Sequence, residues 1–252
     1  MSRITQKGAT GPLSLVANGA FQTSTDSSLA TLVGTRWDLS DGREVILGLA
    51  SSATTVASGK LYADPAELTN HANCAVTAYT AYSNNGNVPA KVTMTLGATA
   101  VTANQYAGGF LIVNDSTGEG QTLRIASHPA ADASASLAVT LEEGATTTIV
   151  AGASEVSLIP PHGKNVIISP TTETGASFGV GLYPVAASSY GFFVSKGLVA
   201  CLGDGTLTVG SAVSPSNAVA GAVENGVIAQ GFVGQAAQTG VDTEYRAIFV
   251  NL

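Results

Sequence analysis

Charged side chains are scarce in this sequence. Its 252 residues include only 10 Lys and Arg and 17 Asp and Glu, so 11% of the chain is charged, less than half of the roughly 25% usual in soluble domains. Ala, Gly, Ser, Thr and Val take their place, and surfaces built from such side chains lose little entropy when they become ordered. This composition favours a protein that packs against copies of itself.

Clusters of basic residues are also lacking, because the Lys and Arg residues stand singly along the chain. Binding to nucleic-acid phosphates requires several clustered cations, and so does attachment to an anionic membrane surface. With a net charge of −7, the sequence predicts neither a nucleic-acid partner nor a membrane partner.

Long apolar runs are absent. No stretch approaches the roughly 18 apolar residues of a transmembrane helix, and no such stretch follows Met1–Lys7 to form a secretory signal. We therefore expect synthesis in a bacterial cytoplasm. The two cysteines, Cys74 and Cys201, lack metal-ligand spacing, and small buried thiols are favoured over a disulfide.

The residue patterns of catalytic sites are missing as well. His71, His128 and His162 have no His, Cys or carboxylate at metal-ligand spacing, which predicts isolated surface or loop histidines. No G-x-S-x-G elbow occurs, and the adjacent Glu142 and Glu143 point to opposite faces of a strand. The sequence thus predicts no catalytic residue, no metal, no cofactor and no enzymatic activity.

Turn and strand signals are plentiful. Asn-Gly and Asp-Gly pairs, which suit tight hairpin turns, begin at residues 18, 41, 85, 204 and 225. Two hairpins are predicted from them, one joining 35–39 to 44–47 and one joining 198–201 to 206–209. Alternating or continuously apolar runs predict further strands at 92–96, 110–113, 122–125, 137–141, 166–168 and 245–250. The continuously apolar runs at 110–113 and 166–168 are expected to be covered on both faces. One short helix is expected at 64–68, with Asp64 as its cap and Pro65 in its first turn.

The fold class is therefore all-β, with antiparallel β-barrel or sandwich units, an extended N-terminal arm and very little helix. Residues 1–30 are polar and are interpreted as this arm, which is expected to contain one loose hairpin. A break is favoured near 159–163 or near 169–172, because Pro-rich segments cannot continue a strand ladder. With the boundary at about 170, we expect a first β domain at 31–170 and a small β-barrel-like domain at 171–252.

Two groups of apolar residues are candidates for a subunit interface. Aromatic side chains are densest at 189–194, where a strand facing a core or an interface is favoured over a stacking platform for sugar. The arm has little core of its own, so its apolar side chains require a partner. The predicted interface comprises Ile4, Leu13, Leu15, Val16, Phe21, Tyr190, Phe192 and Phe193.

The C-terminal stretch resembles the small β-barrel cement proteins that decorate the heads of tailed bacteriophages. It reads GLVACLGDGTLTVGSAV over 197–213, AGAVE over 220–224 and GFVGQA over 231–236, before a last hydrophobic strand. The segments 102–115 and 125–130 are similar to predicted structural proteins of marine phages. Together these stretches extend the resemblance over about two thirds of the chain.

The resemblance implies a virion structural protein that binds the outer surface of an icosahedral head and stabilises the junctions between capsomers. It implies the major capsid protein and further copies of the chain, most simply a homotrimer, as partners, and it carries no catalytic residues. The alternative is a tail, baseplate or fibre component that contacts a host glycan.

Overall fold

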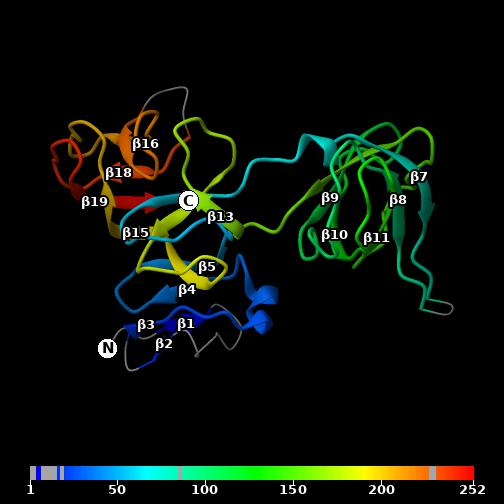
Figure 1. Cartoon of the computed structure of the whole chain (residues 1–252), viewed down its shortest axis with the longest axis horizontal. Helices are drawn as coiled ribbons and strands as arrows, with labels where there is room; N and C mark the ends of the chain where they lie inside the picture. The colour runs from blue at the N-terminus through cyan, green and yellow to red at the C-terminus, as the bar shows by residue number, and fades with distance from the viewer. Residues whose placement is uncertain (1–3, 7–15, 18–19, 85–86, 227–230) are drawn as a thin grey trace. The chain divides into compact units, whose positions relative to one another are not determined.

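The computed structural model describes residues 4–6, 16–17, 20–84, 87–226 and 231–252, and side chains from residue 22 onward. The chain forms two compact units (Figure 1). The first contains residues 1–66 and 162–252, and the second contains residues 67–161. The second unit is therefore an insertion into the first. This corrects the sequential division at about 170, because 31–66 and 171–252 belong to one unit.

The first unit is built on an eleven-stranded sheet, in which β5 and β13 run parallel and the other described strand pairs are antiparallel. In spatial order its strands are β1 (Ile4–Gln6), β4 (Arg36–Leu39), β5 (Glu44–Ala50), β13 (Lys164–Ile168), β6 (Leu61–Ala63), β14 (Ser177–Gly181), β15 (Tyr190–Leu202), β19 (Tyr245–Asn251), β18 (Gly234–Ala236), β16 (Ala212–Pro215) and β17 (Val223–Asn225). Strand β5 also pairs with β15, so the first half of the chain is joined directly to the second half. A separate two-stranded ladder joins β2 (Val16–Ala17) to β3 (Ala20–Phe21).

The central strands of this sheet are buried on both faces. In β5, Val45 and Leu47 enter one hydrophobic cluster and Ile46 enters another, because successive strand residues point to opposite sides. In β15, Phe192 and Phe193 divide in the same way. The sequences of these strands are consequently nearly continuous runs of apolar residues.

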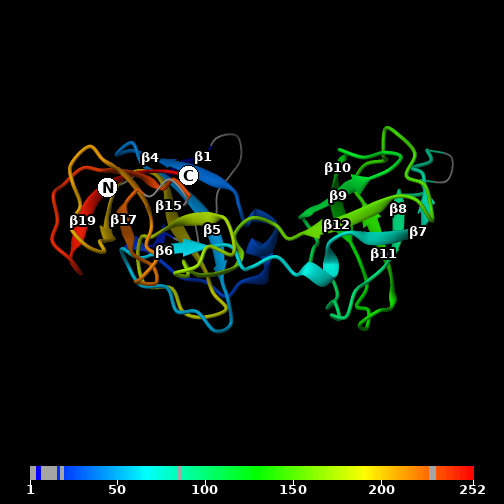
Figure 2. The same ribbon diagram turned by 90° about the horizontal axis from the view of Figure 1, so that it is seen from above.

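The second unit is a closed barrel of six antiparallel strands, which Figure 2 shows from above. Around the barrel the strands are β10 (Thr122–Ser127), β11 (Ser136–Leu141), β8 (Lys91–Thr95), β7 (Cys74–Thr80), β12 (Glu155–Ile159) and β9 (Phe110–Asp115). Alternate residues of β8 and β11, such as Met94 and Val139, fill the interior and form its core. Their polar neighbours face outward, as the period of two predicts.

The all-β prediction is confirmed: among the described residues, helix is limited to the short 3-10 turns η2 (Ser27–Leu32) and η3 (Thr69–His71). The hairpin of 35–39 with 44–47 is confirmed as the pair β4–β5, and the other predicted strands are present. Strand β9, expected to be covered on both faces, instead buries alternate residues. The closed barrel, expected in 171–252, lies in the inserted unit.

The second predicted hairpin is wrong. Gly205 does adopt a positive φ of +68°, but β15 pairs with β5 and β19 rather than with residues 206–209. Leu207 instead forms an isolated bridge with Gly240. Residues 196–202 of β15 pair with β19, and residues 206–209 form no ladder with β15.

The predicted helix at 64–68 is also wrong. The Asp64 carboxylate accepts hydrogen bonds from the Gly163 amide at 2.8 Å and pairs with His162 Nδ1 at 2.6 Å, so it does not cap residues 65–67. This contact joins the two points at which the chain leaves and re-enters the first unit. The Pro160-Pro161 break, one of the two expected boundaries, coincides with the end of the insertion.

The predicted N-terminal arm is partly incorporated into the first unit. Strand β1 pairs with β4 at the edge of the large sheet, and Leu29 in η2 is buried in the main hydrophobic cluster. The expected loose hairpin corresponds to β2 and β3.

Candidate protein-binding face

One face of the C-terminal part of the large sheet is apolar and exposed. Strands β15 and β19 place three apolar pairs directly opposite one another: Leu198 with Phe249, Ala200 with Ala247 and Leu202 with Tyr245. Leu198, Tyr245 and Phe249 are 46%, 48% and 54% exposed. The alternate residues of both strands, such as Ile248, point into the core. These six residues are called the outer β15–β19 face below.

A hollow of about 420 Å³ lies beside this face. Leu198, Ala200 and Tyr245 line it together with the segment at Gly59. Gly59 has a φ of +73°, and a Cβ atom there would lie 2.7 Å from the Tyr245 ring. Glycine therefore allows the ring to pack closely against the backbone and fixes its position at the edge of the hollow.

The cations around the hollow are paired with acids. Arg43 contacts the Asp41 carboxylate at 2.6 Å, and Arg246 forms an ion pair with Glu244. The hydrogen bond from Arg43 lowers the pKa of Asp41 below its usual range, because it stabilises the charged carboxylate. The face consequently presents aliphatic and aromatic surface with balanced charge at its margin.

The predicted aromatic interface is corrected by the burial of its residues. Phe192 packs edge-to-face on Trp37 with ring centroids 5.3 Å apart, and Phe193 packs on Phe178 at 5.1 Å. Both side chains are fully buried and Tyr190 is nearly so, because β15 has a core on each side at this point. Phe192 and Phe193 therefore cannot contact a partner at the surface.

For the arm residues of the predicted interface, the structure describes at most the backbone. Ile4, Val16 and Phe21 belong to β1, β2 and β3 respectively, whose side chains are outside the described part. Leu13 and Leu15 lie outside the described residues.

The residues of the outer face were missed, although the sequence contains the signal for them. In Tyr245–Val250, alternation places Tyr, Ala and Phe on one side and Arg, Ile and Val on the other. Both sides are largely apolar, whereas a strand with one face in water normally alternates with polar residues. Such a strand requires cover on both faces, from its own chain or from a partner.

Two of the three histidines are not the surface groups predicted from the sequence. His71 and His128 are buried in the barrel around Tyr106. His71 Nδ1 lies 2.6 Å from the Tyr106 hydroxyl, and His71 Nε2 lies 3.0 Å from the Thr99 carbonyl oxygen. The carbonyl oxygen only accepts, so Nε2 carries the proton and Nδ1 accepts from the hydroxyl.

His128 is fixed in the same manner. Its Nδ1 donates to the Pro129 carbonyl oxygen at 2.8 Å, and its Nε2 accepts from the Tyr106 amide at 3.0 Å. Both nitrogens of each ring thus have partners, and burial raises the pKa of Tyr106 to about 12. The arrangement satisfies buried polar groups and joins three barrel segments, as a structural network does.

The cysteines are buried thiols, as expected, one in each unit. Burial raises the pKa of both, that of Cys201 to about 12. In the part of the chain that the structure describes, no three His, Cys, Asp or Glu side chains gather as a metal site would require. No described helix has the length and apolar character needed to cross a bilayer.

Comparison with known proteins gives no relative from which to infer a role. No family model matches the sequence, and neither the curated proteins nor the solved structures include a significant match.

Proposed function

We propose that this chain is a structural protein of a tailed bacteriophage particle, a cement protein that binds the outside of the icosahedral head through the outer β15–β19 face. The observation that carries the proposal is the row of three apolar cross-strand pairs on an exposed sheet face. Exposed apolar patches on soluble proteins mark interaction sites. The resemblance of the C-terminal stretch to cement proteins supports the capsid as the proposed partner.

The energetics of this face suit attachment to a lattice. Leu198, Tyr245 and Phe249 each retain about half of their exposure, so complete burial is worth about 1 kcal/mol for each of them. The total is modest for one copy, but a protein that binds the assembled lattice and not the loose subunits stabilises the lattice by mass action.

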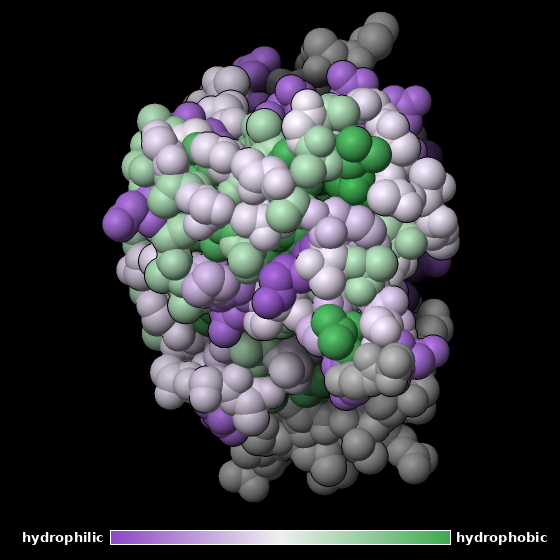
Figure 3. Space-filling view, turned by 90° about the vertical axis from the view of Figure 1, so that its right-hand side faces the viewer, coloured by the Kyte–Doolittle hydropathy of each residue, from purple (hydrophilic) through white to green (hydrophobic). Residues whose placement is uncertain are grey.

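The face drawn in Figure 3 is compatible with close neighbours. On that face, strongly hydrophilic residues are scattered among pale, weakly polar residues and green, apolar ones. Small neutral side chains order at low entropic cost. The major capsid protein and adjacent copies of the chain are the proposed partners, and a homotrimer matches the three-fold positions of an icosahedral shell.

Co-sedimentation with undecorated heads of the parent phage tests the proposal. The substitution Phe249→Ser in the full chain is expected to weaken binding by about tenfold or more, since central aromatic contacts dominate protein interfaces. Phe110→Ser is the matched control, because Phe110 is an exposed strand phenylalanine of the barrel. Equal binding by Phe249→Ser and the unsubstituted chain, or no binding by either, would contradict the proposal.

A tail, baseplate or fibre component that contacts a host glycan is the second candidate. One observation favours it, a hollow in the first unit that is lined mainly by hydroxyl and amide groups.

A further inference from the structure

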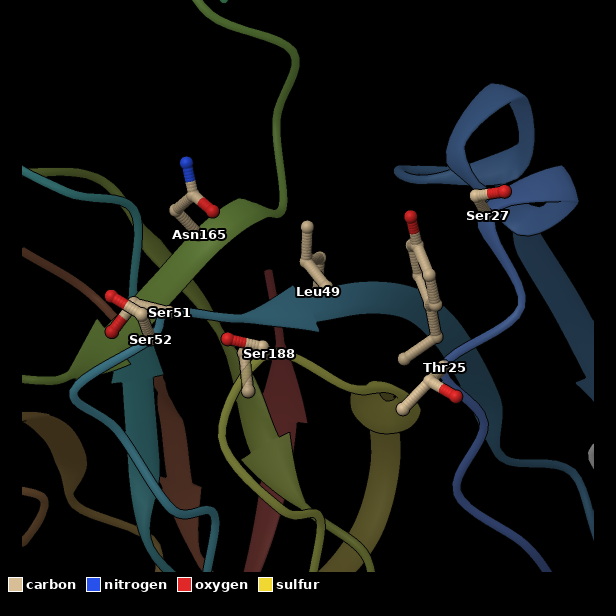
Figure 4. A pocket seen from close by; sticks show the side chains of 9 residues that line it. Thr25, Ser27, Leu49, Ser51, Ser52, Asn165 and Ser188 are labelled. Carbon is tan, nitrogen blue, oxygen red and sulfur yellow. The ribbon is translucent and has the colours of Figure 1, made fainter.

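The first unit contains a second hollow of about 420 Å³, away from the outer β15–β19 face (Figure 4). Its walls come from the end of β5 and the two residues after it, from β13, from the start of β15 and the segment before it, and from the start of η2 and the segment before it. The lining residues are Thr25, Ser27, Leu49, Ala50, Ser51, Ser52, Asn165, Ser188 and Tyr190. This volume lies in the range of small-molecule sites, which spans about 300–1,000 Å³.

The chemistry of the lining is polar and uncharged. Six of the nine side chains carry a hydroxyl group and one, Asn165, carries an amide. These groups both donate and accept hydrogen bonds, so they match a ligand that does the same. Asp26, which lies between two lining residues in sequence, directs its carboxylate to the Ser28 amide at 2.9 Å. The lining selects neither a cation nor an anion.

Several of these polar groups are available to a ligand. The Asn165 amide and the hydroxyls of Ser52 and Ser188 make no side-chain hydrogen bond to any residue that the structure describes, and all three residues are exposed. Leu49, labelled near the middle of Figure 4, supplies apolar surface of the kind that the C–H face of a sugar ring contacts.

The walls are held in place before any ligand binds. The Ser51 amide donates to the Val166 carbonyl oxygen at 3.0 Å, and the Ser188 amide donates to the Ser51 carbonyl oxygen at 3.2 Å. Asn165 and Ser188 have φ angles of +61° and +56°, which few residues other than glycine adopt. Such conformations persist where the surroundings enforce them, and they occur at binding sites more often than elsewhere.

From this arrangement we propose that the hollow binds a neutral polyhydroxylated ligand, namely one sugar unit of a glycan. Asn165, Ser52 and Ser188 form the hydrogen bonds, and Leu49 provides the apolar floor. The proposal does not depend on the capsid role, because it concerns different residues.

Saturation-transfer NMR on the full chain tests this assignment, with glucose, galactose, mannose and N-acetylglucosamine as probes and sialic acid as the charged comparison. The double substitution Asn165→Gly and Ser188→Gly removes two ligand-binding groups while glycine retains both positive φ angles. Each lost hydrogen bond is worth about 1 kcal/mol, so the loss of two is expected to weaken binding by about thirtyfold.

The control is Asn87→Gly, an exposed asparagine of the barrel with a φ of +51°. Binding of a neutral sugar that is lost in the double variant and retained in the control supports the site. No neutral sugar bound at tens of millimolar, an unchanged signal in the double variant, or a preference for sialic acid each overturns it. Retained capsid co-sedimentation by the double variant separates this result from the test of the outer face.

Discussion

The buried hydroxyl of Tyr106 provides a sharp test of the barrel's polar network. Substitution by phenylalanine keeps the ring, which packs between His71 and His128 with centroid distances of 5.6 and 5.9 Å. It removes the O–H that donates to His71 Nδ1 across 2.6 Å. The acceptor nitrogen of His71 is then left buried without its partner.

The expected cost follows from that unsatisfied acceptor. Leaving a buried polar group unpaired destabilises a protein by about 1–3 kcal/mol, and His71 is only 1% exposed. No cavity of consequence forms, because a single oxygen atom is removed. We therefore predict that Tyr106→Phe lowers the free energy of unfolding of the barrel by about 2 kcal/mol at neutral pH.

Raising the pH should reverse the order of stability of the unsubstituted chain and the Tyr106→Phe variant. Burial raises the pKa of Tyr106 to about 12 in the folded state, against about 10 for an unfolded tyrosine. Because the folded pKa is the higher one, the stabilisation is fully present below pH 10 and is lost as the pH rises toward 12. The loss approaches about 3 kcal/mol for two pKa units, and phenylalanine at this position does not incur it.

Thiol labelling during urea unfolding reports the two units separately. Cys74 is buried in the barrel and Cys201 in the first unit, so each is modified when its own unit opens. At pH 8, Tyr106→Phe should shift the labelling of Cys74 to lower urea and leave that of Cys201 unchanged. Between pH 10 and 12, the unsubstituted barrel should lose stability faster than the variant. Tyr82→Phe, at an exposed barrel tyrosine, is the control, and equal shifts in both variants would refute the reasoning.

Two further predictions concern the first unit. Asp64→Asn should lower its stability by about 1–2 kcal/mol, because the Gly163 amide loses a charged acceptor at 2.8 Å; an unchanged melting temperature would show that this contact contributes nothing. Gly59→Ala should cost more than Gly42→Ala. Both glycines have positive φ, but a Cβ at Gly59 meets the Tyr245 ring and one at Gly42 meets nothing within 4 Å; equal melting temperatures would contradict this.

Sequence patterns predicted the positions of the strands better than the pairing between them. The period-two runs of β8, β10 and β11 and the turn between β4 and β5 are local signals, and the structure contains all of them. The pairing of β15 with β5 joins residues about 150 positions apart, and no local pattern specifies it. The hairpin predicted after β15 was wrong because the turn at Gly205 was correctly predicted, but the strand before it was assigned the next segment of the chain as its pairing partner.

Side chains with distant partners account for other errors. The Asp64-Pro65 pair has the local form of a helix start, but the carboxylate bonds to residues 98 and 99 positions away. His71 and His128 stand alone in the sequence and meet only when the barrel closes around Tyr106. Such contacts depend on topology, which residue spacing does not encode.

The candidate face was predictable in part. The alternation of residues along Tyr245–Val250 predicts a strand with two apolar faces. The structure then determines which of the two faces the first unit leaves uncovered. The aromatic residues at 190–193 have a stronger local signal, but they are covered by two cores of the same unit. Apolar character alone therefore did not distinguish core from interface.

Electron-microscopy reconstruction of the phage particle to which the chain is proposed to belong tests the central proposal most directly. Density for the chain is expected on the outside of the head, with Leu198, Tyr245 and Phe249 buried against the major capsid protein. Density located in the tail, or on the head with the outer β15–β19 face open to solvent, would contradict it.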